Sequence, residues 1–176
     1  MAGEITFQPT EADYLTAAKA FYLRQVRSHR FFGRLAMLVA FALTLVVGAL
    51  LLLGTPVLEA LMSGIVGALS GLVALVPCLG LNYLLLPRRA RRLFKQSKSQ
   101  HQPMTFGWSA NDSFWHSAHA EQRLPWLHYH RWRETGSVYL LYLNDTLYQF
   151  VPRHVLTAGQ DTDLRETLIA SGLPRR

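Results

Sequence analysis

The residues of this chain whose types could do chemistry are its histidines and the serines near them. His116 and His119 lie three positions apart, and His128 and His130 share one face of a predicted strand. A structural zinc site needs about four converging nitrogen, sulfur or oxygen ligands, and a catalytic one needs about three. Because residues three apart on a strand point to opposite faces, His116 and His119 make a poor chelate. We therefore predict no metal site and interpret these histidines as solvated or partly packed side chains.

Nucleophilic catalysis is the second chemistry to consider, because Ser113 and Ser117 lie near histidines. The sequence contains no nucleophile elbow and no identifiable oxyanion site. It also lacks a phosphate-binding loop and a glycine-rich dinucleotide turn. We therefore expect a protein that is not an enzyme, with no catalytic residues and no cofactor.

The tryptophans offer a third possibility, a surface that binds a ligand or a peptide. We favour positions in a core or facing a membrane for most of them and keep the binding surface as the alternative. The residues concerned are Trp108, Trp115, Trp126 and Trp132.

The positive charge of the chain is concentrated on either side of an apolar region. The net charge is +7, yet only 16% of the 176 residues are charged, against roughly 25% in ordinary globular proteins. Positions 19–34 carry five basic residues and 88–98 carry six, with no acid in either, whereas 104–176 carries seven of each sign. A nucleic-acid footprint would load a folded face with positive charge. We therefore predict no nucleic-acid partner.

Two apolar stretches predict two transmembrane helices. Positions 35–53 hold 19 residues without an ionisable group, which as a helix would be roughly 28 Å long, close to the ~30 Å hydrocarbon thickness of a bilayer. A second run, about 57–86, contains only Glu59, near its start, and Gly54 is a plausible stop between the two. We therefore predict a tight membrane hairpin over 35–87. Neither span has an acid, base or histidine at mid-membrane depth, which argues against an ion-coupled transporter.

The basic residues predict the orientation of this hairpin. They flank it on both sides, and the connecting loop has no lysine or arginine, so by the positive-inside rule both termini are cytoplasmic. We expect the bilayer as a partner, with anionic lipids attracted by about 1 kcal/mol per basic residue near the surface. The predicted interfacial residues are Arg27, Arg30, Arg34, Arg88, Arg89, Arg91, Arg92 and Lys95.

Small residues recur along the second predicted span at Gly64, Gly67 and Gly71. The spacing of the last two matches the small-xxx-small pattern that allows helices to approach closely. Packing against the first span is the reading that we favour. Association with a second copy, giving a homo-oligomer, stays open.

The remaining sequence predicts cytoplasmic segments at 1–34, 88–103 and 104–176. The first opens with "EITFQ", a possible edge strand, after which Thr10 and Asp13 resemble a capping box at the start of an amphipathic helix. The second is a basic juxtamembrane segment followed by a polar linker. The third is a small α+β domain.

The pattern over 104–176 changes to the period of two that is typical of strands. "MTFGWSA" and "SFWHSAHA" are separated by a turn at Asn111, and "SVYLLYL" and "TLYQFVP" by a turn at Asn144. Between these pairs "LPWLHYHRWRE" alternates as one strand would, and "DTDLRETLIASGL" reads as a closing helix with apolar residues at Leu164, Leu168 and Ile169. We expect an antiparallel sheet of about five strands capped by one helix.

This order of elements resembles the YcxB-like family of small bacterial membrane proteins. The likeness lies in "T-x-x-D-Y" at Thr10 to Tyr14, in the two spans with a basic exit, and in "LPWLHYHRWRET", "YQFVPRHVL" and "DTDLRETL". The resemblance implies a bacterial inner-membrane location. It also implies a pleckstrin-homology-like domain, a bent antiparallel sheet with a carboxy-terminal helix. It supplies no catalytic residues.

These observations favour a non-enzymatic membrane protein whose cytoplasmic domain binds a protein, a peptide or a lipid headgroup at the membrane face. The alternative is an accessory or immunity-type protein that acts through its spans on another membrane protein. The identity of the protein partner is left open by the sequence.

Overall fold

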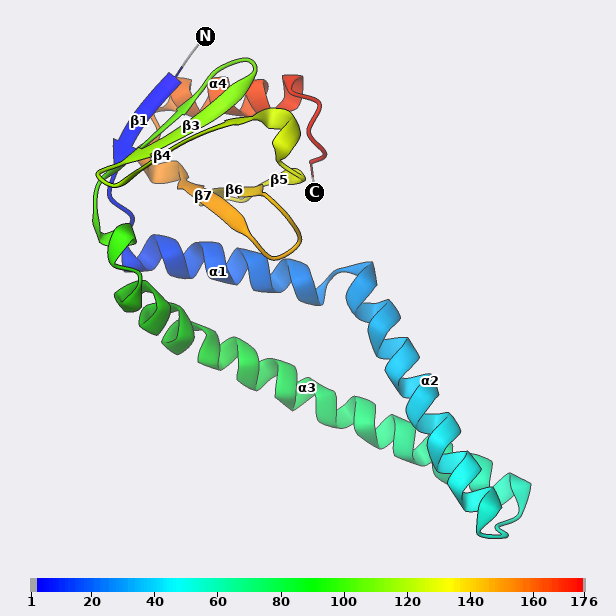
Figure 1. Ribbon diagram of the computed structural model, residues 1–176. Helices are drawn as coiled ribbons and strands as arrows, with labels where there is room; N and C mark the ends of the chain where they lie inside the picture. Colours follow the sequence, from blue (N-terminus) through cyan, green and yellow to red (C-terminus); the bar gives the residue numbers. More distant parts are fainter. Residues whose placement is uncertain (1–2, 176) are drawn as a thin grey trace. The chain divides into compact units, whose positions relative to one another are not determined.

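The computed structural model describes residues 3–175, which form two compact units. One comprises 3–20 together with 88–175, and the other comprises 21–87 (Figure 1). Helix α1 (Glu11–Val26) begins in the first unit, helix α2 (His29–Leu52) lies in the second, and helix α3 (Val57–Gln96) ends in the first. The sheets and the remaining helices all belong to the first unit.

Helices α2 and α3 are long and apolar enough to cross a membrane. Each predicted span is helical, and both helices extend beyond the apolar runs. Helix α2 starts at His29, where the Ser28 side chain accepts a hydrogen bond from the Phe31 amide at 3.1 Å. Helix α3 continues to Gln96, because the arginines and lysine after Pro87 are good helix formers. Gly54, with φ of +82°, lies in the turn between the two helices.

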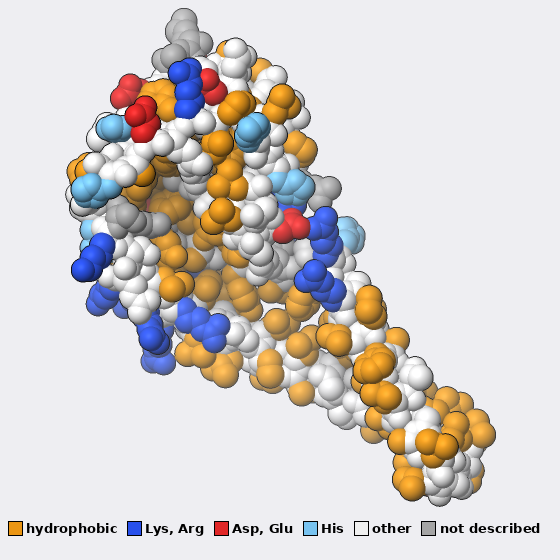
Figure 2. Space-filling view, viewed as in Figure 1, with side chains coloured by type: hydrophobic (Ala, Val, Ile, Leu, Met, Phe, Trp, Pro, Cys, Tyr) orange, Lys and Arg blue, Asp and Glu red, His pale blue; other side chains and the backbone are white. Residues whose placement is uncertain are grey.

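The apolar side chains of these helices have few partners within the described residues. No residue of α2 is buried, and Met37, Leu38 and Val73 are each at least 65% exposed. Figure 2 shows hydrophobic side chains along this unit on the face in view. The helices touch closely at Gly64, where a Cβ atom would lie 2.7 Å from Val47 Cγ2 and 2.9 Å from Leu43 Cδ1.

The start of α1 follows the predicted capping box. The Asp13 carboxylate accepts from the Thr10 amide at 3.0 Å and from the Thr10 hydroxyl at 2.7 Å. In return the Asp13 amide donates to the Thr10 hydroxyl at 3.2 Å. These bonds satisfy main-chain donors that the first turn of a helix cannot pair internally. The prediction is confirmed.

The first sheet has four antiparallel strands in chain order. They are β1 (Gly3–Phe7), β2 (Met104–Trp108), β3 (Asp112–Ser117) and β4 (Ala120–Pro125). Strand β1 pairs with β2 at one edge, from Gly3 opposite Trp108 to Phe7 opposite Met104. The predicted amino-terminal edge strand is therefore confirmed, and it joins residues a hundred positions apart.

The second sheet has three antiparallel strands in chain order, and helices follow it. The strands are β5 (Arg131–Glu134), β6 (Val138–Tyr142) and β7 (Tyr148–Pro152). Short 3-10 helices η1 (Lys98–His101), η2 (Trp126–His128) and η3 (Arg153–Val155) connect elements, and α4 (Ala158–Ala170) closes the chain. Both predicted hairpin turns, near Asn111 and Asn144, are confirmed.

The expectation of about five strands was wrong in two places. "SFWHSAHA" divides between β3 and β4, because a two-residue turn, Ala118 and His119, reverses the chain. "LPWLHYHRWRE" is not one strand: it breaks after Pro125, which has no N–H to donate to a ladder. Helix η2 then places Trp126 and Tyr129 inward, both 3% exposed, and Leu127 outward at 88%.

The core lies between the two sheets and α4. Leu164 and Leu168 of α4 are fully buried, whereas Ile169, grouped with them from the sequence, is 55% exposed. Helix α4 lies alongside β1 (Figure 1). Buried Trp108 donates its indole N–H to Asp163 of α4 at 2.8 Å. Trp108, Trp126 and Trp132 are core residues and Trp115 is partly buried against them, as the favoured reading predicted.

A polar cluster around Tyr129 crosses the core from one sheet to the other. The Tyr129 hydroxyl lies 2.9 Å from the Ser113 hydroxyl and accepts from the Trp115 indole N–H at 3.3 Å. It donates to Gln149 of β7 at 2.8 Å, and the Gln149 amide donates to Gln122 of β4 at 2.9 Å. Burial raises the pKa of Tyr129, so the phenol stays protonated and able to donate.

We expect Tyr129→Phe to lower the free energy of unfolding by about 1–3 kcal/mol, because it leaves Ser113 and Trp115 without their buried partner. Chemical denaturation of the full chain in detergent, followed by tryptophan fluorescence, measures the change. Leu127→Ala, at an exposed position, is the control and should shift stability by less than about 0.5 kcal/mol. Equal stability of Tyr129→Phe and the parent would contradict the bridging role.

Candidate functional site

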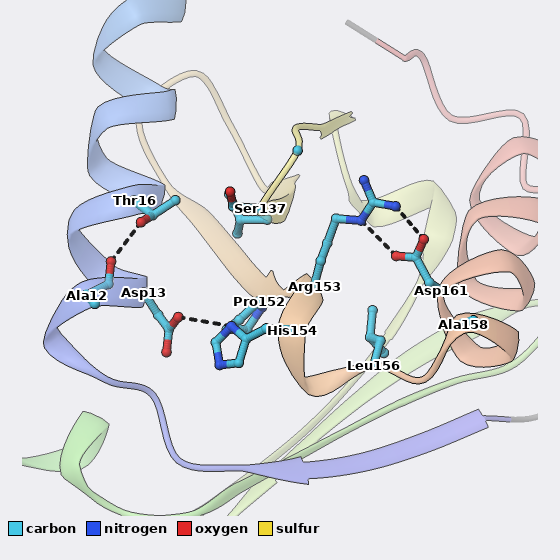
Figure 3. A pocket seen from close by; sticks show the side chains of 12 residues that line it. Ala12, Asp13, Thr16, Ser137, Pro152, Arg153, His154, Leu156, Ala158 and Asp161 are labelled. Atoms are coloured by element: carbon cyan, nitrogen blue, oxygen red, sulfur yellow. Dashed lines mark hydrogen bonds and ion pairs between the residues drawn. The ribbon is translucent and has the colours of Figure 1, made fainter.

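An open cleft of about 620 Å³ lies in the first unit between the start of α1 and the end of the second sheet (Figure 3). Helix α1 supplies one wall. Residues of β6 and β7, the turn before β6, helix η3 and the first turns of α4 supply the rest. The lining residues are Ala12, Asp13, Thr16, Gly136, Ser137, Val138, Pro152, Arg153, His154, Leu156, Ala158 and Asp161.

The α1 wall presents Asp13, and η3 presents His154 opposite it. His154 Nδ1 lies 3.4 Å from Asp13 Oδ1, and Figure 3 shows the imidazole directed at the carboxylate. The Asp13 side chain is only 11% exposed, whereas that of His154 is 62% exposed. The capping bonds to Thr10 hold the carboxylate in place, so the exposed imidazole is the group that can move toward a ligand.

The opposite side of the cleft is held by a pair between Arg153 and Asp161. The guanidinium donates twice to the carboxylate, through Nε at 2.8 Å and through Nη2. This hydrogen bonding lowers the pKa of Asp161 and raises the pKa of Arg153. The Tyr139 hydroxyl also donates to Asp161 Oδ1 at 3.0 Å, and burial raises the pKa of that phenol.

Glu134 extends this pair into a charged network beneath the cleft. Its carboxylate, 12% exposed, lies 3.5 Å from Arg153 Nη1, 3.2 Å from Arg165 Nε and 2.9 Å from Arg175 Nη2. Arg153 Nη1 also donates to the Thr135 carbonyl at 3.2 Å. The charge of Arg153 is thus engaged within the protein, and the network fixes the shape of the cleft rather than offering a free cation.

The cleft contains a serine, a histidine and an aspartate, but they are not arranged as a catalytic triad. A nucleophilic serine needs a hydrogen bond to its general base. Within residues 3–175 no hydrogen bond joins the Ser137 hydroxyl to His154. The arrangement instead offers hydroxyl, imidazole and carboxylate groups to a bound polar molecule.

The residues singled out for metal or nucleophilic chemistry lie apart from this cleft. His116 is on β3, His119 is in the β3–β4 turn, His128 is in η2 and His130 precedes β5. The described part of the chain contains no group of three or more histidine, cysteine or acidic residues that could hold a metal ion. The serines have main-chain or core partners: Ser113 contacts Tyr129, and the Ser117 hydroxyl donates to the Ala120 carbonyl at 3.3 Å.

The predicted interfacial basic residues lie on or beside the long helices. Arg27 is in the turn after α1, Arg30 and Arg34 are on α2, and the other five are on α3. Arg91 Nε lies 2.9 Å from Glu11 Oε1, with both side chains at least 40% exposed. An exposed pair of this kind contributes little to stability.

The three glycines predicted to pack helices have different surroundings. Gly64 faces Leu43 and Val47 of α2, whereas a Cβ atom at Gly67 or Gly71 would meet nothing within 4 Å. All three line an apolar groove of about 300 Å³ between α2 and α3. Gly64 is therefore the point of close helix contact, and the other two leave open space.

Sequence reasoning did not single out the cleft residues as a site. Asp13 was recognised only as a cap, and Ser137, Arg153, His154 and Asp161 were not named as binding residues. A usable signal was present, since Arg153 and His154 directly follow a predicted strand and an acid stands in the first turns of the next helix. Their convergence with α1 depends on contacts across about 140 positions, which local pattern cannot supply.

Comparison with known families matches residues 108–168 to the family described as "YcxB-like protein". Residues 108–168 are similar to this family, and we refer to this segment as the YcxB-like domain. The resemblance drawn from sequence is thereby confirmed for this segment, which runs from the last residue of β2 into α4. Searches of curated proteins and of solved structures gave no match. Most of the cleft belongs to the YcxB-like domain, while Asp13 and the α1 wall come from outside it.

We expect acid to weaken the folded YcxB-like domain through Asp161. Because Arg153 lowers the pKa of this carboxyl in the folded state, the stabilisation is full above the unfolded pKa of about 4 and is lost as pH falls through the lower folded value. Asp161→Asn should cost about 2 kcal/mol at pH 7 and flatten the loss of stability below about pH 4.

Unfolding curves of the full chain at several pH values would check this. Glu166→Gln on the exposed side of α4 removes a carboxylate outside the network, is the matched control, and should change stability at pH 7 by less than about 0.5 kcal/mol. An Asp161→Asn protein that loses stability in acid as steeply as the parent would refute the assignment. Hydrogen bonding to Arg123 likewise lowers the pKa of Asp112, so this carboxylate acts in the same direction.

Proposed function

We propose that the chain is an integral protein of the bacterial inner membrane, with α2 and α3 as its spans and both termini in the cytoplasm. Support comes from the absence of buried residues on α2 and from the large exposed apolar side chains on both helices. A core helix of a soluble protein would be mostly buried, and water would oppose exposing so much apolar surface. Basic residues flank the pair, while the turn at Gly54 has none.

We further propose that the YcxB-like domain is pleckstrin-homology-like. Two antiparallel sheets of four and three strands, followed by α4, suit the bent sheet with a carboxy-terminal helix that the family resemblance implies. Strand β1 completes the first sheet, so the amino-terminal segment is part of this fold.

The function that we propose is non-enzymatic binding of a protein, peptide or lipid headgroup in the cleft beside Asp13 and His154. The observation that carries this proposal is the cleft itself, an open volume of about 620 Å³ lined by groups that donate and accept hydrogen bonds. Its α1 wall continues through Arg27 and Ser28 directly into α2. An occupant that shifts α1 would therefore act on the start of the first span.

A second candidate is an accessory or immunity-type protein that acts through its spans on another membrane protein. The groove between α2 and α3 favours it, because Gly67 and Gly71 leave space along an apolar surface. Small residues in such a groove permit close approach of another helix.

Labelling should place the turn between α2 and α3 outside the cytoplasm. In a Cys78→Ser background, which removes the chain's single cysteine, we expect Thr55→Cys to react with a membrane-impermeant maleimide in intact spheroplasts. Thr146→Cys, in the β6–β7 turn, should react only after permeabilisation. The reverse pattern would overturn the orientation, and equal reaction at both sites in intact spheroplasts would overturn the hairpin.

Crosslinking in native membranes, followed by mass spectrometry, tests the proposed cleft. Ser137→Trp should reduce capture of the partner by about tenfold, because an indole at this exposed position fills the cleft. Leu127→Trp, also at an exposed site but outside the cleft, is the matched control and should capture normally.

Two outcomes would contradict binding in the cleft. One is undiminished capture by a folded Ser137→Trp protein. The other is capture by a chain ending at Gln102 that is lost on Gly67→Leu and Gly71→Leu substitution, which would move function to the spans. These two glycines suit that test because, unlike Gly64, they have no neighbour that a side chain must displace.

A further inference from the structure

Three of the four edge strands in the two sheets are covered by other parts of the first unit. At the β1 edge, the Gln160 side chain of α4 donates to the Glu4 carbonyl at 3.3 Å. At the β5 edge, the Trp132 amide donates to the Pro174 carbonyl at 3.0 Å. Strand β7 receives no such bond from the described residues, but α1 contacts it through side chains, with the rings of Tyr14 and Phe150 6.3 Å apart.

Strand β4 is the exception. Its neighbour in the sheet is β3, and no other described segment adds a main-chain hydrogen bond to it. Five of its six residues are exposed, and Leu124 is partly buried. The exposed Gln122 side chain accepts a hydrogen bond from the Gln149 amide of β7 at 2.9 Å and takes no part in the main-chain ladder. An open edge of this kind is a template for another strand.

The charges on β4 are complementary to those of a second β4 running antiparallel to it. In the sequence "AEQRL", Glu121 and Arg123 lie on either side of Gln122. If a two-fold axis passes at Gln122, Glu121 of each copy faces Arg123 of the other, and Ala120 faces Leu124. Opposite charges directly across two strands stabilise the pairing.

In a single copy of the chain, the side chains of Glu121 and Arg123 are exposed and can reach a second strand. The Arg123 side chain is 72% exposed and uses Nε for Asp112, at 2.8 Å, so its terminal nitrogens point to solvent. Glu121 is exposed opposite His116 on β3. A register shift by two residues, which centres the pairing on Glu121, would place Glu121 opposite its own copy, and like charges directly opposite are destabilising.

We infer that β4 pairs with β4 of a second copy of this chain, antiparallel and centred on Gln122, so that the two four-stranded sheets join into one. The contact is short, because Pro125 ends the strand. It therefore depends on a high local concentration, which confinement of both copies to one membrane supplies under the proposed location. It does not depend on what occupies the cleft.

Disulfide crosslinking of the full chain in isolated membranes tests the register. Residues directly opposite in antiparallel strands have Cα atoms about 4.5–5.5 Å apart, within disulfide range. In a Cys78→Ser background, oxidised Gln122→Cys protein should give a covalent dimer, and Thr146→Cys should not. Since Gln122→Cys also removes the bond to Gln149, a second pair is needed: Glu121→Cys and Arg123→Cys chains expressed together should crosslink to one another.

Charge exchange supplies an independent readout. Glu121→Lys should reduce dimer formation through Gln122→Cys by about tenfold, because two attractive pairs become like-charge contacts. Expression of that chain with an Arg123→Glu chain should restore the dimer, since both cross-strand pairs again join opposite charges. Loss of the proposed cleft function would leave all of these yields unchanged.

Three results would overturn the inference. They are the absence of a covalent dimer from both cysteine designs, a yield that does not respond to Glu121→Lys, and crosslinking of β4 only to a different protein. The last would assign the edge to a foreign strand.

Discussion

The pairing of Arg153 with Asp161 is the interaction on which the architecture around the cleft depends. It joins η3, which directly follows β7, to the first turns of α4, and through Glu134 it reaches β5 and the carboxy-terminal tail. Partly buried charges are costly unless they are paired and hydrogen-bonded. Here each carboxylate has at least two donors, so the network holds the position of α4, and Leu164 and Leu168 then close the core.

The same network determines which polar groups of the cleft remain exposed. The Arg153 guanidinium is paired with Asp161 and Glu134. The polar groups of the cleft that remain for a ligand are the Ser137 hydroxyl, the exposed His154 imidazole and the Asp13 carboxylate. Asp13 lies on the helix that leads into the first apolar helix. A ligand bound between α1 and the YcxB-like domain would therefore contact the helix that continues into the proposed spans.

Much of the fold could be predicted from residues with a strong local signature. Thr10 and Asp13 marked the start of α1, the apolar runs marked α2 and α3, and the turns at Asn111 and Asn144 were correct, because each depends on chemistry within a few positions. The strand over 124–134 was wrong because alternation continued through Pro125, while the chain used the proline to stop pairing. On a strand Trp126 and Tyr129 would point to opposite faces, whereas the 3-10 turn places both of them inward.

The sequence by itself determined the two long apolar helices, the charge around them and the family of residues 108–168, since length, hydropathy and short motifs are local properties. The tertiary structure alone decided that Asp13 faces His154, that Tyr129 bridges two sheets and that β4 remains an open edge. Each of these needs the amino-terminal strand and helix to meet a domain that begins about a hundred residues later. Contacts between segments so far apart form because both segments pack around the same core, and the pattern of a short stretch of sequence cannot reveal them.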